Sequence, residues 1–361
     1  MKRNFSLILT IGLVLLVSLA FAVPALAAET KAIKLRLAAV FPPPAQSLGS
    51  YGVKLWMDEV TKKTDGQVTF DTFWGGALGK PPEHLTLVER GMADLVLTHR
   101  WYTPGKLPLG QFEYVFPFGP VDPLVVTKAK RQIFEEFPDF RKNLAKYNAL
   151  LVMNASACAY QILSRTPLRT LQDFEGKKIS LIGRYFGRWV DACGAIPVVA
   201  PAADRYTMLQ TGVVDLDLLP LDLFASYKIQ EQAPILTIVN LLTANWPDLL
   251  MNAKSFDRLP KSVQTIFIET GKEIELRMGE RDINEWTNKV LEEFKKQNVT
   301  TNEFPESERD KWASMVEDIP AEWAEEVTKQ GYPGWEIVHR YQELTTQMGY
   351  KWPRKWGLKK Q

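Results

Sequence analysis

Alternating apolar and polar positions predict short strands along the chain, and apolar positions three or four residues apart predict helices between them. Near the N-terminus, Ile33, Leu35 and Leu37 alternate with two basic residues, which is typical of a half-buried strand. Prolines from residue 42 onward end this strand, and helical spacing begins at Ser47. We expect strands at residues 33–37, 68–74, 94–98, 150–153, 177–182, 197–200 and 213–217, and helices at 47–64, 82–89, 187–193 and 205–211.

A longer amphipathic pattern follows these elements. Residues 261–297 carry apolar side chains on one helical face, which predicts one or two long helices packed across the body of the protein. Beyond them, a helical tail with a basic end contains tryptophans that we interpret as packing anchors: Trp312, Trp323, Trp335, Trp352 and Trp356.

Strands that alternate with helices in two successive rounds predict an α/β fold with two lobes. The length of 361 residues also exceeds what one compact core usually holds. We therefore expect two α/β lobes with a cleft between them and long C-terminal helices. The expected divisions are 1–27 as signal peptide, 29–153 plus 241–281 as lobe I, and 154–240 plus 282–361 as lobe II with the C-terminal helices.

The first residues have the organisation of an export signal. Lys2 and Arg3 precede an apolar run over residues 5–21, and an Ala-Leu-Ala cleavage pattern ends at Ala27. We expect export across the inner membrane, cleavage and a periplasmic location; an uncleaved membrane anchor is the alternative. In that compartment Cys158 and Cys193 could form a disulfide or remain buried thiols.

Composition and charge exclude several classes of protein. The chain has 44 basic and 42 acidic residues, which is not the strong positive balance of a nucleic-acid-binding protein. Lys2 and Arg3 account for the difference, so a neutral mature protein would have to hold an anion through local groups. Two cysteines and three scattered histidines predict no metal centre.

Catalytic and cofactor motifs are absent. The segment 75–80 is glycine-rich, but it lacks P-loop spacing and has Pro81 where a phosphate-binding loop needs a hydroxyl. The sequence has no nucleophile elbow, zinc-binding helix or dinucleotide-binding turn. We therefore expect no enzyme activity, no catalytic residues and no cofactor.

Several ordered stretches resemble one family, the solute-binding proteins of tripartite ATP-independent periplasmic (TRAP) transporters, dicarboxylate-binding type. The resemblance covers about residues 33–297, and it is carried by residues 76–94, 171–179, 194–215, 227–228 and 256–260. It implies a two-lobed periplasmic binding protein fold with a ligand cleft between the lobes, and a receptor without turnover that closes over a small organic anion. Such a receptor delivers its ligand to the small and large membrane subunits of a TRAP transporter.

The sequence departs from the family pattern at the ligand site. Members typically carry an arginine after the Gly-Lys-Lys-Ile segment, where its guanidinium binds the ligand carboxylate, but this chain has Ser180. The polar Glu-Asn pair expected before the following proline is also replaced, because Leu218 and Leu219 precede Pro220.

Two interpretations follow from these departures. In the first, the positive charge has moved to Arg184 or to Arg100, which follows His99, and aromatic residues suit a bulky or aromatic monocarboxylate. The aromatic candidates are Trp101, Tyr102, Tyr185, Trp189 and Trp246.

In the second interpretation, Ser180, Asn240 and Asp217 bind a neutral or metal-bridged solute. The same lobes could then serve a periplasmic sensor protein or an enzyme. The complete set of predicted ligand-binding residues is Arg184, Arg100, His99, Ser180, Asn240, Trp246, Asp217 and Tyr185.

Overall fold

The structure is a computed structural model that describes residues 32–243 and 247–358. The predicted signal peptide and Trp246 lie outside the described residues. Within the described residues, the chain from Lys34 onward forms one compact unit. Within the described residues, the helices lack an apolar stretch long enough to cross a membrane.

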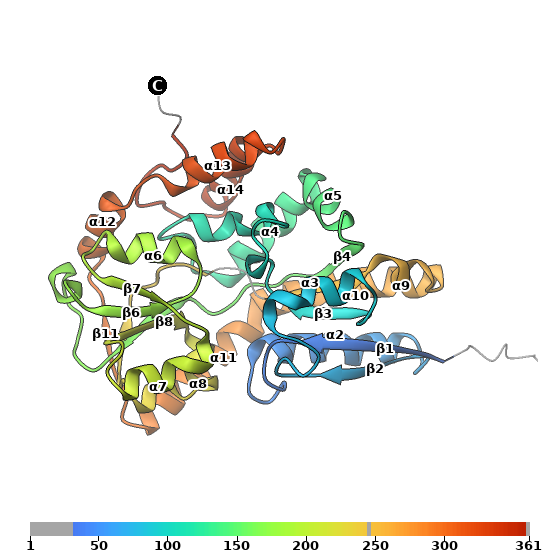
Figure 1. The fold of residues 1–361 in the computed structure, drawn as a ribbon, viewed down its shortest axis with the longest axis horizontal. Helices are drawn as coiled ribbons and strands as arrows, with labels where there is room; N and C mark the ends of the chain where they lie inside the picture. The colour runs from blue at the N-terminus through green and yellow to red at the C-terminus, as the bar shows by residue number, and fades with distance from the viewer. Residues whose placement is uncertain (1–31, 244–246, 359–361) are drawn as a thin grey trace, which may run out of the picture. The chain divides into compact units, whose positions relative to one another are not determined.

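One sheet has five strands in the order β2-β1-β3-β10-β4 (Figure 1). Strands β1 and β3 are parallel, with Leu37 beside Leu95, whereas β10 runs antiparallel to both β3 and β4. The strands of this sheet are β1 (Ile33–Ala39), β2 (Val68–Phe73), β3 (Leu95–Thr98), β4 (Ala149–Met153) and β10 (Asp248–Asn252). The helices near it in sequence are α2 (Leu48–Lys63), α3 (His84–Glu89), α4 (Pro123–Glu136), α5 (Asp139–Ala145), α9 (Ala253–Asp257) and α10 (Lys261–Arg277).

A second sheet has six strands in the order β11-β9-β5-β8-β6-β7. Its central strand β5 is antiparallel to both neighbours, and β8, β6 and β7 run parallel to one another. The strands are β5 (Tyr160–Ser164), β6 (Lys178–Leu181), β7 (Ile196–Val199), β8 (Leu216–Pro220), β9 (Ile235–Ile238) and β11 (Thr300–Glu303). Its helices include α6 (Arg184–Asp191), α7 (Arg205–Gln210), α8 (Leu221–Ser226) and α11 (Ile283–Lys296). Two sheets with their helices confirm the predicted two-lobed α/β fold; the exact residue division between the lobes stays a prediction.

The predicted long amphipathic segment forms α10 and α11, joined by a π-helical turn at Met278–Asp282. Helix α10 packs on α2 and β4, and α11 packs on α8. Gly271 makes the close approach to β4 possible, because a Cβ atom there would lie 2.1 Å from the Val152 carbonyl oxygen. This segment therefore contacts elements of both sheets.

The C-terminal tail forms α12 (Glu306–Met315), α13 (Ile319–Lys329) and α14 (Gly334–Gln347), and α14 lies against α4 (Figure 1). Trp312 and Trp323 are almost completely buried. Their indole N–H groups donate to the carbonyl oxygens of Trp189 at 2.7 Å and Pro108 at 3.3 Å. Burial of large aromatic rings with satisfied donors confirms their predicted role as packing anchors.

Cys158 and Cys193 are both free and buried. Burial raises the pKa of Cys193 to about 12 and that of Cys158 well above its usual value. Because the thiolate is the reactive form, both thiols should be inert in the folded protein.

We therefore expect a thiol reagent such as Ellman's reagent to label neither cysteine in the folded chain and both after unfolding in guanidinium chloride. Fewer than two reactive thiols in the unfolded, unreduced chain would instead indicate a disulfide. Reduction is expected to leave the melting temperature unchanged.

Candidate ligand-binding site

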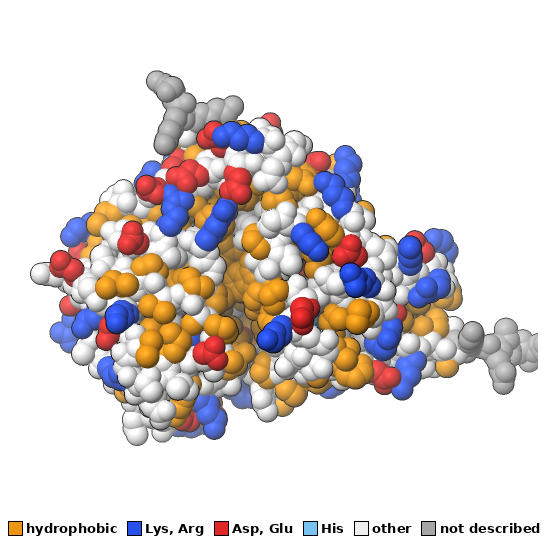
Figure 2. All heavy atoms as spheres, viewed as in Figure 1, with side chains coloured by type: hydrophobic (Ala, Val, Ile, Leu, Met, Phe, Trp, Pro, Cys, Tyr) orange, Lys and Arg blue, Asp and Glu red, His pale blue; other side chains and the backbone are white. Residues whose placement is uncertain are grey.

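A small cavity is lined by residues that belong to both sheets or to the loops beside them. Its volume of about 20 Å³ leaves room for about one water molecule. The lining residues are Phe41, Ser47, Gly49, His99, Trp101 and Pro247 from the side of the five-stranded sheet, and Ala157, Tyr160, Pro220, Asp222 and Leu223 from the other side. On the face drawn in Figure 2, hydrophobic side chains also gather along a central hollow. The cavity is small, but both sheets contribute its wall.

Aromatic rings form much of the cavity wall. His99 follows the carboxyl end of β3, and its ring packs edge-on against Phe41 and lies 4.4 Å from the ring of Trp101. From the other sheet, Tyr160 begins β5 and packs against Phe186 at 4.7 Å. Ligands of open α/β sheets bind outside the carboxyl ends of strands, which is where His99 lies.

Among the described residues, His99 and the aromatic candidate Trp101 are those predicted from the sequence that line this cavity. His99 belongs to the set of predicted ligand-binding residues. Burial lowers its pKa to about 3, so the imidazole is neutral at ordinary pH. Its Nδ1 atom is buried and has no hydrogen-bond partner among the described residues. A neutral imidazole has one donor and one acceptor nitrogen, so His99 has unused hydrogen-bonding capacity.

Asp222 lies on the opposite wall, in the first turn of α8. Asp222 is only 5% exposed, and this burial raises the pKa of its carboxyl group to about 6. Hydrogen bonds from the backbone of Leu223 and from the Cys158 thiol partly oppose that rise. Its Oδ1 atom has no partner within residues 32–243 and 247–358.

The raised pKa of Asp222 makes its contribution to stability depend on pH. The folded chain keeps the proton up to about pH 6, whereas the unfolded chain releases it near 3.8, so stability is lost as pH rises through this interval. Relative to wild type, Asp222→Asn is expected to gain about 2 to 3 kcal/mol of unfolding free energy between pH 4 and pH 7. Urea unfolding at both pH values measures this; a constant difference between the two proteins would mean that Asp222 titrates normally.

Arg205, Asp217 and Ser180 form a buried cluster in the six-stranded sheet. Arg205 begins α7, and its Nη1 lies 2.8 Å from Asp217 Oδ1, which also accepts from the Ser180 hydroxyl at 2.9 Å. Further Arg205 N–H groups donate to the carbonyl oxygens of Ala200 and Leu218. Arg205 thus makes four hydrogen bonds: one to Asp217, two to Ala200 and one to Leu218. They use four of the five N–H groups of the guanidinium.

The positive charge of Arg205, which is not among the residues that line the cavity, acts on the pKa of Tyr160, which is. It opposes the rise in pKa that burial causes at Tyr160, which lines the cavity, and it acts in the same way on Tyr102 and Tyr227. Burial raises the pKa of Asp217, and Arg205 with Ser180 counters that effect. Ser180 and Asp217, both predicted from the sequence, are thus brought together around an arginine that the sequence analysis did not single out.

Arg100 belongs to a different buried cluster, beside the five-stranded sheet. Its Nε donates to Asp248 Oδ2 at 2.9 Å, and both side chains are almost fully buried. Lys130 and Glu113 form a neighbouring ion pair at 3.4 Å. The side chain of Arg100 thus pairs with a carboxylate of its own sheet, while His99, next in sequence, lines the cavity.

Arg184 and Tyr185 lie at the start of α6. Arg184 donates to the Tyr185 hydroxyl at 2.7 Å and forms an ion pair with Glu326 of α13, and its side chain is 58% exposed. Asn240 has a left-handed backbone with φ 47° and accepts from Gln161 at 2.8 Å. Arg184, Tyr185 and Asn240 do not line the cavity that His99 lines, so their roles as ligand contacts stay predictions.

The sequence analysis missed Arg205, Asp222 and Tyr160. Arg205 is four residues before Leu209 and shares its buried face, so a charged residue on that face was a signal for a buried ion pair. Asp222 falls two residues after Pro220, beyond the segment compared with the family.

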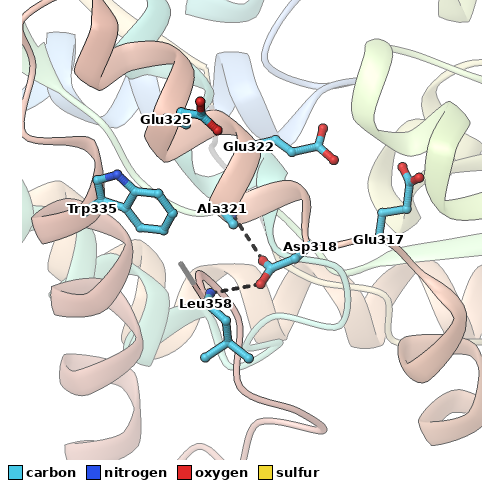
Figure 3. Close-up of a pocket in the computed structure, with 7 residues that line it drawn as sticks. All are labelled: Glu317, Asp318, Ala321, Glu322, Glu325, Trp335 and Leu358. Carbon is cyan, nitrogen blue, oxygen red and sulfur yellow. Dashed lines mark hydrogen bonds between the residues drawn. The ribbon is translucent and has the colours of Figure 1, made fainter. Parts of the chain in front are cut away.

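A larger pocket of about 870 Å³ lies at the surface beside α13 and is shown in Figure 3. It is lined by Glu317, Asp318, Ala321, Glu322, Glu325, Trp335 and Leu358. The Asp318 carboxylate accepts from the backbone N–H groups of Ala321 and Leu358. Four carboxylates make this pocket a poor site for an anion.

Comparison with known proteins gives one matching family. The model of the bacterial extracellular solute-binding proteins, family 7, matches residues 41–326. A solute-binding protein of Sulfitobacter sp. (strain NAS-14.1) is 25% identical over 274 residues, which cover 74% of this chain and 80% of the relative.

Solved structures share the fold. A TRAP solute-binding protein from Rhodoferax ferrireducens T118, in complex with copurified benzoate, has a TM-score of 0.78 and 20% identity, covering 87% of this chain and 98% of its own. A marine metagenome TRAP solute-binding protein specific for aromatic acid ligands, in complex with 3-hydroxybenzoate, has a TM-score of 0.78 and 19% identity, covering 89% and 100%.

Proposed function

Because the chain belongs to family 7 of the bacterial extracellular solute-binding proteins, we propose that it is a periplasmic receptor that captures a small organic acid and delivers it to a TRAP-type secondary transporter. Proteins of the same fold were solved with benzoate and with 3-hydroxybenzoate. In this proposal the chain binds its ligand without chemical turnover, and its partners are the small and large membrane subunits of the transporter.

The observation that carries the proposal is the cavity to which both sheets contribute aromatic walls. Phe41 and Trp101 line one side and Tyr160 the other, so a flat ligand could be enclosed between rings. A buried apolar site with a few polar groups is the usual form of a small-molecule binding site. An aromatic or otherwise bulky monocarboxylate fits these walls best.

We place the ligand carboxylate on the side of Arg205. Ser180 occupies the position where the family carries its clamp arginine, and Arg205 is connected to it through Asp217. Arg205 has one N–H group beyond its four named hydrogen bonds, and its charge acts on Tyr160 in the cavity wall. Arg184 and Arg100 are the alternatives predicted from the sequence. All three arginines pair with a carboxylate of the protein, but among them Arg205 is the one joined to Ser180 through its partner carboxylate.

Binding must involve separation of the cavity walls. A volume of about 20 Å³ cannot hold an aromatic acid, so the walls contributed by the two sheets have to move apart and close again. Hinge closure of this kind can bury a ligand almost completely.

The proposal is tested with a panel of aliphatic, aromatic and hydroxy acids, by thermal shift and then by calorimetric titration. We expect at least one aromatic acid to raise the melting temperature and to bind with one ligand per chain. If none of the acids raises it, the proposed function is wrong.

A pair of tryptophan variants locates the site. Trp101→Leu should weaken binding at least tenfold, because it removes an aromatic wall of the cavity. Trp335→Leu is the matched control, since Trp335 is also partly buried but lines the pocket of Figure 3. Equal effects of the two substitutions would contradict the placement of the ligand.

The arginine assignment is tested by Arg184→Ala. If the carboxylate binds beside Arg205, this variant should keep its affinity within about twofold of wild type, because the exposed Arg184 pair contributes little. A tenfold or larger loss of affinity would instead identify Arg184 as the carboxylate ligand.

A further inference from the structure

Two polar atoms without partners belong to residues on opposite sides of the same cavity. One is Oδ1 of Asp222, which follows β8 in the six-stranded sheet, and the other is Nδ1 of His99, which follows β3 in the five-stranded sheet. Both residues are more than nine-tenths buried, with exposures of 5% and 7%. Within the described residues, Oδ1 is the oxygen of the Asp222 carboxyl group that is buried without a hydrogen-bond partner.

Buried polar atoms without partners are costly. Each one costs about 1 to 3 kcal/mol when no water or ligand satisfies it. The cavity can hold about one water, and such a water could bridge the two atoms before a ligand arrives. A ligand that displaces this water without replacing its hydrogen bonds would lose affinity.

The chemistry of the pair specifies the ligand group. A carboxylate accepts hydrogen bonds, so Asp222 requires an O–H or N–H donor, and the neutral imidazole of His99 can accept from or donate to the same group. We propose that Asp222 and His99 recognise an O–H or N–H donor that the bound acid carries apart from its carboxylate. This inference rests on the proposed function and adds a specificity-determining pair to that site.

The same arrangement disfavours dicarboxylates. Asp222 puts a negative group in the cavity wall, whereas Arg205 lies in the neighbouring cluster with Asp217 and opposes the pKa rise of Tyr160, which lines the same cavity. A second ligand carboxylate beside Asp222 would place two like charges together in a buried site. A monocarboxylate with a separate donor group complements both ends.

The experiment uses matched acids that differ by one donor group. The pairs are benzoate with 3-hydroxybenzoate, phenylacetate with 3-hydroxyphenylacetate, propanoate with lactate, and 3-oxocyclopentanecarboxylate with pyroglutamate. By calorimetric titration of the full chain at pH 7.5, we expect the donor-bearing member of at least one pair to bind ten times or more tighter.

Variants then assign that preference to Asp222. Asp222→Ala should reduce the preference, measured as the ratio of the affinities for the two acids of a pair, to less than twofold. Asp222→Asn keeps the size of the side chain and provides a second measurement if the alanine variant folds poorly. Because its amide N–H can donate, this variant should bind the donor-bearing acid less tightly than wild type does. It should bind 3-methoxybenzoate, which offers only an acceptor at that position, more tightly than wild type does. Glu325→Gln, at the pocket of Figure 3, is the carboxylate control and should behave like wild type.

The outcomes separate the two proposals. Acids that bind without any preference for a donor, or a preference that survives in both Asp222 variants, would overturn the recognition pair and leave the receptor function intact. If no acid of either kind binds the wild-type chain, the receptor function itself fails and the inference falls with it.

Discussion

Substitution of Arg205 by methionine is expected to lower the free energy of unfolding by about 3 to 5 kcal/mol. The Arg205 and Asp217 side chains are both 0% exposed, and the guanidinium is the charge that offsets the buried carboxylate. Without it, Asp217 must either stay ionised without a counter-charge or take up a proton. Two backbone carbonyl oxygens, of Ala200 and Leu218, would also lose their donors.

Removal of both charges should be less harmful than removal of one. The double variant Arg205→Met with Asp217→Leu is expected to be more stable than Arg205→Met alone, because it leaves no unpaired charge. Urea unfolding of the wild type, the two single variants and the double variant measures this coupling. Strictly additive losses would mean that the two side chains do not depend on each other.

Arg100→Met is expected to cause a loss of similar size, about 3 to 5 kcal/mol, because it removes the buried positive charge that pairs with Asp248. Asp248 would keep the hydrogen bonds from Asn154 and from the backbone N–H of position 100, but it would lose the one from Arg100 Nε. The substitution should act mainly on stability, since the carboxylate partner of Arg100 is already present in the protein.

Arg184→Ala is the matched comparison for Arg100→Met. Its ion pair with Glu326 is exposed on both sides, so its loss should change the unfolding free energy by less than about 1 kcal/mol. Guanidinium chloride would screen such pairs, so urea is the suitable denaturant. A stability change at Arg100 as small as that at Arg184 would contradict the structural role given to Arg100.

The regular elements followed from local pattern. The predicted strands at 33–37 and 177–182 correspond to β1 and β6, and the expected helix at 205–211 corresponds to α7. Alternation and helical spacing reflect which side chains face a core, and neighbouring residues carry that information.

Other elements lacked a pattern of this kind. Strands β5 and β10 are buried at every position, so their side chains do not alternate between apolar and polar. Helix α4 was not among the expected elements, although Asp122 and Pro123 form a recognisable helix start. Tertiary burial on both faces removes the signal on which strand prediction depends.

The site shows the same division. The replacement of the clamp arginine by Ser180 is visible in the sequence, as is the nearness of His99 to a strand end. Whether an arginine faces a cavity, a carboxylate or solvent depends on residues far away in the chain. Arg100 meets Asp248 at a separation of 148 residues, and Arg184 meets Glu326 at a separation of 142.

The sequence by itself determined the α/β class, the order of most elements, the resemblance to one receptor family and the loss of its usual carboxylate clamp. The tertiary structure alone decided which charges are already paired and which polar atoms remain without partners beside a cavity. Local pattern is fixed by neighbours along the chain, whereas charge pairing and cavity walls arise when β3, β5 and α8 are brought together by folding. For that reason Asp222 and Arg205 became candidates only once their surroundings were known.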